Sequence, residues 1–198
     1  FTQINHGRTD MKGALIRRAD GAWDLGFHGA SLDLAPVWKD LMDGGGKEVF
    51  GDFVLAAEFE KVWIDADRSL ADVSGTFQRE DQIWRTVYLQ TMLDNKTALN
   101  VSLKPGADGN RTLEIDAADA GVVLRTLGLY ENMQGGLMQL TGTFADNQPD
   151  RPLKGQLIVR DYRVLKAPAL AHLVSIMALT GILDALEGDG LGFAVLDI

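Results

Sequence analysis

The sequence contains no cysteine. This absence excludes disulfide bonds, thiolate metal sites and a cysteine nucleophile. It is compatible with a reducing cytosol and also with a bacterial periplasm, where many proteins have no disulfides. Sequons at Asn95, Asn100 and Asn110 would suggest glycosylation in a eukaryotic secreted protein, but the pattern is common by chance and the lack of cysteine argues against that interpretation.

Basic residues are scarce. The chain has 19 Lys and Arg against 28 Asp and Glu, which gives a formal net charge of −9. Nucleic-acid binding needs a basic face, so this class of function is excluded. Docking on anionic headgroups is equally disfavoured, and any contact with lipid is expected to involve acyl chains. With 46% hydrophobic and 24% charged residues, the 198-residue chain is expected to be globular with a substantial core.

Motifs for catalysis and metal binding are also lacking. The histidines lie far apart, without the spacing of metal ligands: His6, His28 and His172. Neither Ser74 nor Ser175 lies in a Gly-x-Ser-x-Gly nucleophile motif. We therefore predict that the protein is not an enzyme and has no cofactor or metal.

A long apolar stretch lies near the C-terminus. Over residues 168–186 the ionisable side chains are His172 and Asp184 alone. Pro168 suits a first helical turn and Gly188 a helix end, so we predict a helix of about 19 residues, roughly 28 Å long. A helix without a polar face must be buried in protein, in lipid or in a groove that binds lipid. Asp184 in the last turn argues against a membrane span.

Alternation of apolar and polar residues dominates the remaining sequence and predicts β-strands. Phe53, Leu55, Phe59 and Trp63, for example, share one face of a strand expected over 53–64. The predicted strands cover residues 11–18, 23–32, 53–64, 70–78, 82–93, 97–103, 113–116, 133–144 and 154–165.

Two short helices are predicted over 34–42 and 120–129, because Asp33 and Asp119 are typical N-cap residues. The predicted fold class is mainly β (α+β), with a mainly antiparallel sheet, these two short helices and the long apolar C-terminal helix. We expect residues 1–198 to form a single domain that is a fragment of a longer protein.

Several strands have large apolar groups on both faces, and 82–93 is the clearest case. Strict alternation places Trp84, Tyr88 and Met92 on one side, and Ile83, Val87, Leu89 and Leu93 on the other. Two apolar faces indicate that both sides of the sheet are covered. The helices can cover one side, and the other needs a second sheet, another domain or a ligand.

Three stretches together resemble a known family. They are GASLDLAPVWKDL at 29–41, DAADAGVVLRTLGLYENMQGGLMQLTG at 116–142, and the segment 155–193 with its Ala-Pro-x-Leu-Ala, Leu-Thr-Gly-Ile and Gly-x-Gly-x-x-Phe motifs. In this order they are similar to the AsmA-like C-terminal region of bacterial envelope proteins, the YhdP/TamB-type bridge-like lipid-transfer family. The resemblance covers about half of the chain.

The resemblance implies a curved antiparallel sheet that forms an apolar trough, in a β-taco-like arrangement. It also implies a periplasmic location, a parent protein anchored in the inner membrane, and movement of phospholipids toward the outer membrane. Membrane association would come from segments outside this chain. The expected partners are phospholipid acyl chains and the remaining domains of the parent protein. Candidate groove residues are Phe53, Leu55, Phe59, Trp63, Trp84, Tyr88, Leu170, Leu173, Val174 and Met177.

Three functions remain open from the sequence. The first is a non-enzymatic domain that binds or conducts acyl chains between the inner and outer membranes. The second is a structural module that closes the end of a long periplasmic β scaffold, in which the same aromatic residues form a closed core. The third is a hydrolase with a dispersed carboxylate site.

Overall fold

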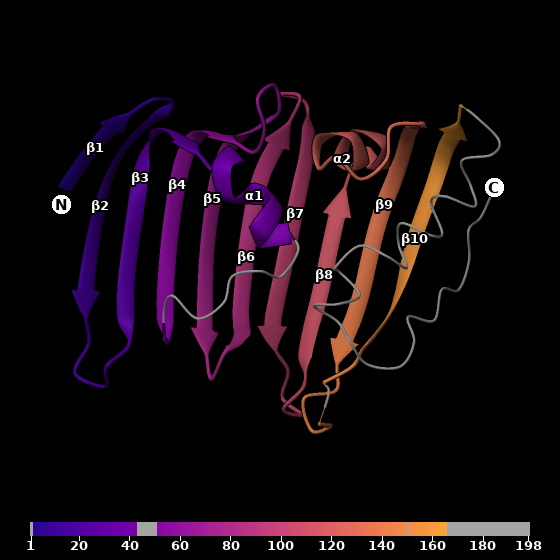
Figure 1. Cartoon of the computed structure of the whole chain (residues 1–198). Helices are drawn as coiled ribbons and strands as arrows, with labels where there is room; N and C mark the ends of the chain where they lie inside the picture. Colours follow the sequence, from indigo (N-terminus) through magenta and orange to yellow (C-terminus); the bar gives the residue numbers. More distant parts are fainter. Residues whose placement is uncertain (1, 43–50, 150, 166–198) are drawn as a thin grey trace.

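The computed structural model describes residues 2–42, 51–149 and 151–165. Within these residues ten strands form one open sheet, and their spatial order follows the sequence from β1 to β10 (Figure 1). Two short helices, α1 and α2, lie over the same face of the sheet. The mainly β fold with two short helices is therefore confirmed. The elements are β1 Thr2–His6, β2 Thr9–Arg17, β3 Trp23–Asp33, α1 Ala35–Met42, β4 Phe53–Trp63, β5 Ser69–Glu80, β6 Ile83–Leu93, β7 Thr97–Pro105, β8 Arg111–Ala117, α2 Ala120–Thr126, β9 Met133–Phe144 and β10 Leu153–Val164.

Tight turns with left-handed residues join several neighbouring strands. Asp81 and Gln82 between β5 and β6 have φ angles of 50° and 64°, and Asp94 and Asn95 after β6 have 52° and 53°. Positive φ at two successive residues is typical of type I′ turns, whose twist matches that of antiparallel strands. β2 and β3 also form a hairpin, and its turn contains Gly21 at φ 90°.

One pair of neighbours, β3 and β4, is parallel. The pairing runs from Trp23 opposite Phe53 to Asp33 opposite Trp63, and the connection between the two strands contains α1. Parallel neighbours need such a crossover, whereas antiparallel ones can be joined by a tight turn. The expectation of an antiparallel sheet is therefore wrong at this pair, while the other neighbouring strands of the described sheet are antiparallel.

Helix α2 begins as predicted and ends earlier than residue 129. The carboxylate of Asp119 accepts a hydrogen bond from the backbone of the first turn, as an N-cap does. At the other end, Gly128 adopts φ 74° and Leu129 N donates to Leu124 O at 2.8 Å. This is a Schellman arrangement, in which a glycine in the left-handed region satisfies the last helical carbonyls.

The third predicted helix, over 168–186, lies outside the described residues. Among the described residues, no helix is long and apolar enough to span a bilayer.

The two faces of the sheet differ. The face that carries α1 and α2 is called the inner face below, and the opposite one the outer face. The main core lies between the inner face and the two helices, where Phe59, Leu93 and Leu99 pack with Val122 and Val123 of α2. Buried side chains thus anchor the helices to one side of the sheet.

Candidate functional site

Apolar residues form two continuous rows across the strands on the inner face. Each row consists of residues directly opposite one another in neighbouring strands. The first apolar row is Leu15, Leu25, Leu55, Phe77, Val87, Leu103 and Leu113. The second apolar row is Gly13, Phe27, Ala57, Gly75, Leu89, Val101, Ile115, Leu140 and Leu157. No polar residue interrupts either row.

Glycine in the second row gives space to aromatic rings. A Cβ atom placed on Gly13 would lie 2.7 Å from the ring of Phe27, its partner across the strands. A Cβ on Gly75 would likewise lie 2.6 Å from the ring of Phe77. Both rings therefore lie over a glycine, where no second side chain projects from the inner face.

The helices cover the inner face unevenly. Trp38 of α1 and Leu127 after α2 pack against the core cluster, and so do Leu89 and Val101 of the second row. Around the first row, Val87, Leu103 and Leu113 pack instead with Phe144 and Leu153, in a cluster that contains no residue of α1 or α2. Within the described part of the chain, the first apolar row therefore has less cover than the second.

Four of the predicted groove residues lie on the inner face. Phe53, Leu55 and Phe59 alternate along β4, and their partners on β5 are inner-face residues. The ring of Trp84 contacts Phe53 edge-on at a centroid distance of 5.7 Å, and Phe77 at 6.4 Å. Phe53 is 8% exposed and Trp84 44% exposed, so this aromatic group is buried at one end and open at the other.

Tyr88 lies on the outer face, apart from this group. It is opposite Thr76 and Ser102, which point away from the helices. A register shift in the pairing of β5 with β6 leaves Arg85 as an extra residue between Trp84 and Thr86. Such a bulge reverses the alternation. The expectation that Trp84 and Tyr88 share a side is therefore wrong.

Trp63 lies in a charged network at the end of β4. Its ring is 4.7 Å from the Arg8 guanidinium and 4.9 Å from the Lys61 ammonium, in two cation–π contacts. Arg8 also donates to the Asp33 carboxylate at 2.9 and 3.0 Å. The hydrogen bond from Arg8 is the main reason why the pKa of Asp33 lies below its usual value. Trp63 thus belongs to a polar rim.

The same rim includes the loop between β4 and β5. Arg68 pairs with Asp65, and its hydrogen bond is the largest of several effects that lower the pKa of Asp65. Arg68 also donates to Thr126 O at 3.3 Å, at the end of α2. The rim therefore ties this loop to a helix that covers the inner face.

The remaining predicted groove residues lie outside the described residues: Leu170, Leu173, Val174 and Met177.

An ion pair is buried at the opposite end of the sheet. Arg111 on β8 makes two hydrogen bonds to Asp146, at 2.6 and 2.7 Å, and these side chains are 6% and 7% exposed. Arg111 also donates to Trp84 O at 2.7 Å and lies 4.4 Å from the Phe144 ring centroid. It therefore links β6, β8 and the loop after β9. No local pattern in the sequence indicates this pair, because its partners are 35 residues apart.

The described residues show no group of three or more His, Asp and Glu arranged to hold a metal ion. Ser74 lies exposed on the outer face of β5, among polar residues of the neighbouring strands. His172 and Ser175 lie outside the described residues.

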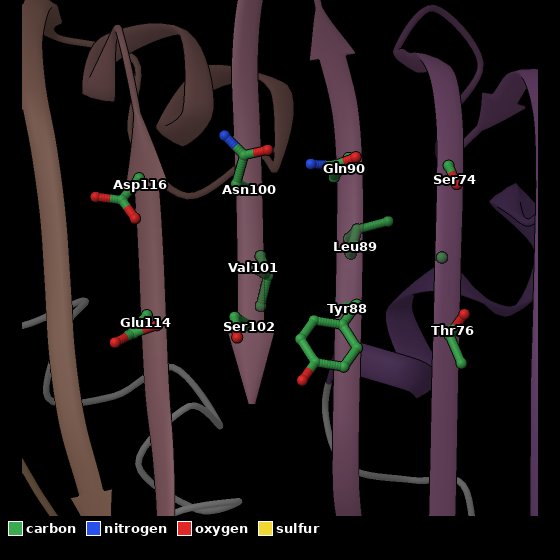
Figure 2. A pocket seen from close by; sticks show the side chains of 11 residues that line it. Ser74, Thr76, Tyr88, Leu89, Gln90, Asn100, Val101, Ser102, Glu114 and Asp116 are labelled. Atoms are coloured by element: carbon green, nitrogen blue, oxygen red, sulfur yellow. The ribbon is translucent and has the colours of Figure 1, made fainter. Parts of the chain in front are cut away.

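The outer face is hollowed over β5 to β8. The central hollow has a volume of about 390 Å³, and Figure 2 shows its lining side chains from the side opposite the helices. It is lined by Ser74, Gly75, Thr76, Tyr88, Leu89, Gln90, Asn100, Val101, Ser102, Glu114 and Asp116. Each strand contributes alternate polar residues, a pattern visible in the sequence. The sequence does not reveal that the pairing register places these polar residues directly opposite one another in neighbouring strands.

A second hollow adjoins the first over β7 to β10. This side hollow has a volume of about 370 Å³ and shares Asn100 and Asp116 with the central hollow. It is more apolar, since Leu137 and Ile158 contribute to its lining together with Arg160. The outer face therefore has a shallow depression that continues across the strands.

No family model matches the sequence, and no curated protein or solved structure is significantly similar to it. The resemblance to the AsmA-like region thus stays a prediction.

Proposed function

We propose that this chain is a non-enzymatic domain of a bacterial envelope protein whose inner face binds phospholipid acyl chains. The domain would form an apolar trough in the periplasm, and its parent protein would conduct phospholipids between the inner and outer membranes. Other segments of that parent would provide the anchor in the inner membrane.

One observation carries the proposal: the two apolar rows run without interruption across the strands of the inner face. A single row crosses from β2 to β10. An acyl chain has no hydrogen-bonding groups, so it needs a continuous apolar surface and no directional partners. The two rows supply such a surface from one strand to the next, in the direction perpendicular to the strands.

Burial of acyl chains on this surface would be favourable. Each methylene group removed from water contributes about 0.8 kcal/mol. Leu55, Phe77 and Val87 of the first row are half-buried, which leaves apolar area available for contact. The charged rim near Trp63 lies at one end of the strands and is partly exposed, so polar headgroups would find polar surroundings there.

The first test is purification without detergent, followed by lipid extraction and mass spectrometry. We expect phospholipid to be present or to be taken up from added vesicles. Absence of both co-purified and exchangeable phospholipid would overturn the proposal.

A second test locates the lipid. The photo-crosslinker p-benzoylphenylalanine is placed at Leu55 on the inner face, or at its chain neighbour Val54 on the outer face. Both side chains are half-buried, so the two variants differ mainly in the face from which they react. We expect crosslinks to phospholipid from position 55 and few from position 54. Equal crosslinking would contradict the inner-face site.

The open edges of the sheet favour a second function, a structural module that closes the end of a longer β scaffold. Among the described strands, β1 and β10 each pair on one side. The free side of an edge strand has unpaired N–H and C=O groups that can accept a further strand. This function predicts a lipid-free chain that associates through its edges. Light scattering combined with hydrogen–deuterium exchange would then show protection of β1 or β10 in the associated form.

A further inference from the structure

We propose that the central hollow on the outer face binds a neutral, extended oligosaccharide of β-1,4-linked hexopyranose units. This site is separate from the inner face, and its ligand is of a different chemical class. The proposal depends on four properties of the hollow: its hydrogen-bonding groups, its exposed aromatic ring, its charge and its shape.

Six side chains of the lining can form hydrogen bonds and make none to other described residues. Two polar rows cross the hollow, each formed by residues directly opposite one another. The first is Ser74, Gln90, Asn100, Asp116 and Gln139, and the second is Thr76, Tyr88, Ser102, Glu114 and Thr141. Among the described residues, no hydrogen bond involves the side chains of Ser74, Thr76, Tyr88, Gln90, Asn100 or Ser102. Amides and hydroxyls both donate and accept, as sugar hydroxyls do.

Tyr88 supplies an aromatic surface at the centre of these rows. Its side chain is 47% exposed and lies between Thr76 and Ser102. Figure 2 shows Tyr88 on the same side of the sheet as Gln90 and Asn100, with the acidic residues of β8 beside them. The apolar face of a pyranose ring stacks on an aromatic ring, while its hydroxyls reach the polar groups around it. An exposed tyrosine combines these two properties.

The charge of the hollow selects against anions. Its carboxylates are those of Glu114 and Asp116, and neither Lys nor Arg lines it, whereas the adjoining side hollow includes Arg160. Glu114 is neutralised in part by Lys104 at 2.9 Å, and Asp116 accepts a hydrogen bond from Gln139 at 3.3 Å. A phosphorylated or carboxylated ligand would therefore be repelled, whereas a neutral polyhydroxylated ligand would not.

The shape of the hollow favours an extended ligand. Four neighbouring strands line it, and at a strand spacing of about 4.8 Å they span roughly 14 Å. The side hollow continues the depression toward β10 and shares Asn100 and Asp116 with it. A β-1,4-linked oligosaccharide is a flat ribbon that can lie along such a row, whereas an α-1,4-linked one coils away from it.

The test is titration of the full chain with N-acetylchitohexaose, cellohexaose and maltohexaose, all of them neutral, followed by NMR of backbone and side-chain amides. We expect shifts at Gln90 and Asn100 with N-acetylchitohexaose or cellohexaose, and none with maltohexaose, up to roughly 10 mM. No shift with either β-1,4-linked oligosaccharide would overturn the proposal, and so would equal binding of maltohexaose.

Variants identify the groups that bind. Tyr88→Leu removes the ring and is expected to weaken binding roughly fivefold, whereas Tyr88→Phe keeps the ring and most of the affinity. Asn100→Ala is expected to weaken binding, and Thr143→Ala, an exposed outer-face change outside both hollows, is the matched control. Unchanged affinity in Tyr88→Leu would contradict the site.

Crosslinking of phospholipid from position 55 should not change in Tyr88→Leu. This result would separate the oligosaccharide proposal from the proposal that the inner face binds lipid.

Discussion

Strand β6 presents different side chains to the two faces of the sheet. Val87 and Leu89 point inward and continue the two apolar rows, whereas Tyr88 and Gln90 point outward and continue the two polar rows. An antiparallel sheet with one covered face is expected to alternate in this way. In this chain the alternation also stays in register across neighbouring strands. The same strands therefore form two continuous surfaces of opposite chemistry, and substitutions can be directed at one surface at a time.

The largest expected difference concerns the ion pairs of the two faces. Asp146→Ala leaves Arg111 buried without its partner, and we expect a loss of about 3–5 kcal/mol in the free energy of unfolding. Glu114→Ala breaks the exposed pair with Lys104 on the outer face, and we expect no measurable loss. Urea denaturation of both variants measures the difference. Equal losses of unfolding free energy in the two variants would show that the buried ion pair stabilises the fold no more than the exposed one.

A second difference is expected for single side chains of β6. Leu93 is fully buried in the core cluster, so Leu93→Ala removes packed methyl groups and should cost about 2–5 kcal/mol. Gln90 is exposed on the outer face, and Gln90→Ala should stay within about 0.5 kcal/mol of the wild type. Thermal or urea unfolding measures both values. A cost below about 1 kcal/mol for Leu93→Ala would mean that the inner face is loosely packed.

A smaller difference is expected for two aromatic residues with nearly equal exposure. Trp84 and Tyr88 are 44% and 47% exposed, but Trp84 contacts Phe53 and Phe77 edge-on. We expect Trp84→Leu to cost about 0.5–1.5 kcal/mol through these ring contacts. Tyr88→Leu should cost less than about 0.5 kcal/mol, because the side chain is exposed on the outer face and belongs to none of the core clusters. The reverse order in urea denaturation would contradict the assignment of the two residues to opposite faces.

The sequence predicted most strands of the sheet because alternation and turn residues are local signals. The strand predicted over 133–144 has the bounds of β9, and the turn at Asp94 and Asn95 lies between the strands predicted over 82–93 and 97–103. β1 was missed because Thr2–His6 is short, polar and exposed along its whole length. Such a strand is defined by its pairing with β2 and not by a pattern of its own.

Features that depend on partners distant in the sequence could not be predicted. A period of two is the same in parallel and antiparallel strands, so the parallel pairing of β3 with β4 has no local signal. The bulge at Arg85 depends on how β6 pairs with β5, and it moves Trp84 to the inner face. Both hollows of the outer face likewise depend on register, because each strand contributes polar residues that are ordinary when considered alone.

The smallest expected effect concerns the rim between the two faces. The hydrogen bond from Arg8 holds the pKa of Asp33 below its ordinary value of 3.8. A carboxyl group whose pKa is lowered on folding stabilises the folded state above its unfolded pKa, and this contribution is lost as the pH falls through the folded pKa. The loss is therefore expected below pH 3.8. Asp33→Asn should be less stable than the wild type at about pH 5, and the difference should shrink toward about pH 2.

Urea denaturation at a series of pH values measures this difference. Arg8→Gln removes the same hydrogen bonds from the other partner, so it should show the same change with pH. Its stability should also be lower at every pH, because Arg8 contacts the Trp63 ring and Asp65 O as well. A difference between Asp33→Asn and the wild type that stays constant over this range would mean that the pair does not contribute to folding. In that case Asp33 would stabilise the start of α1 by accepting the 3.1 Å hydrogen bond from Ala35 N, and its negative charge would not contribute.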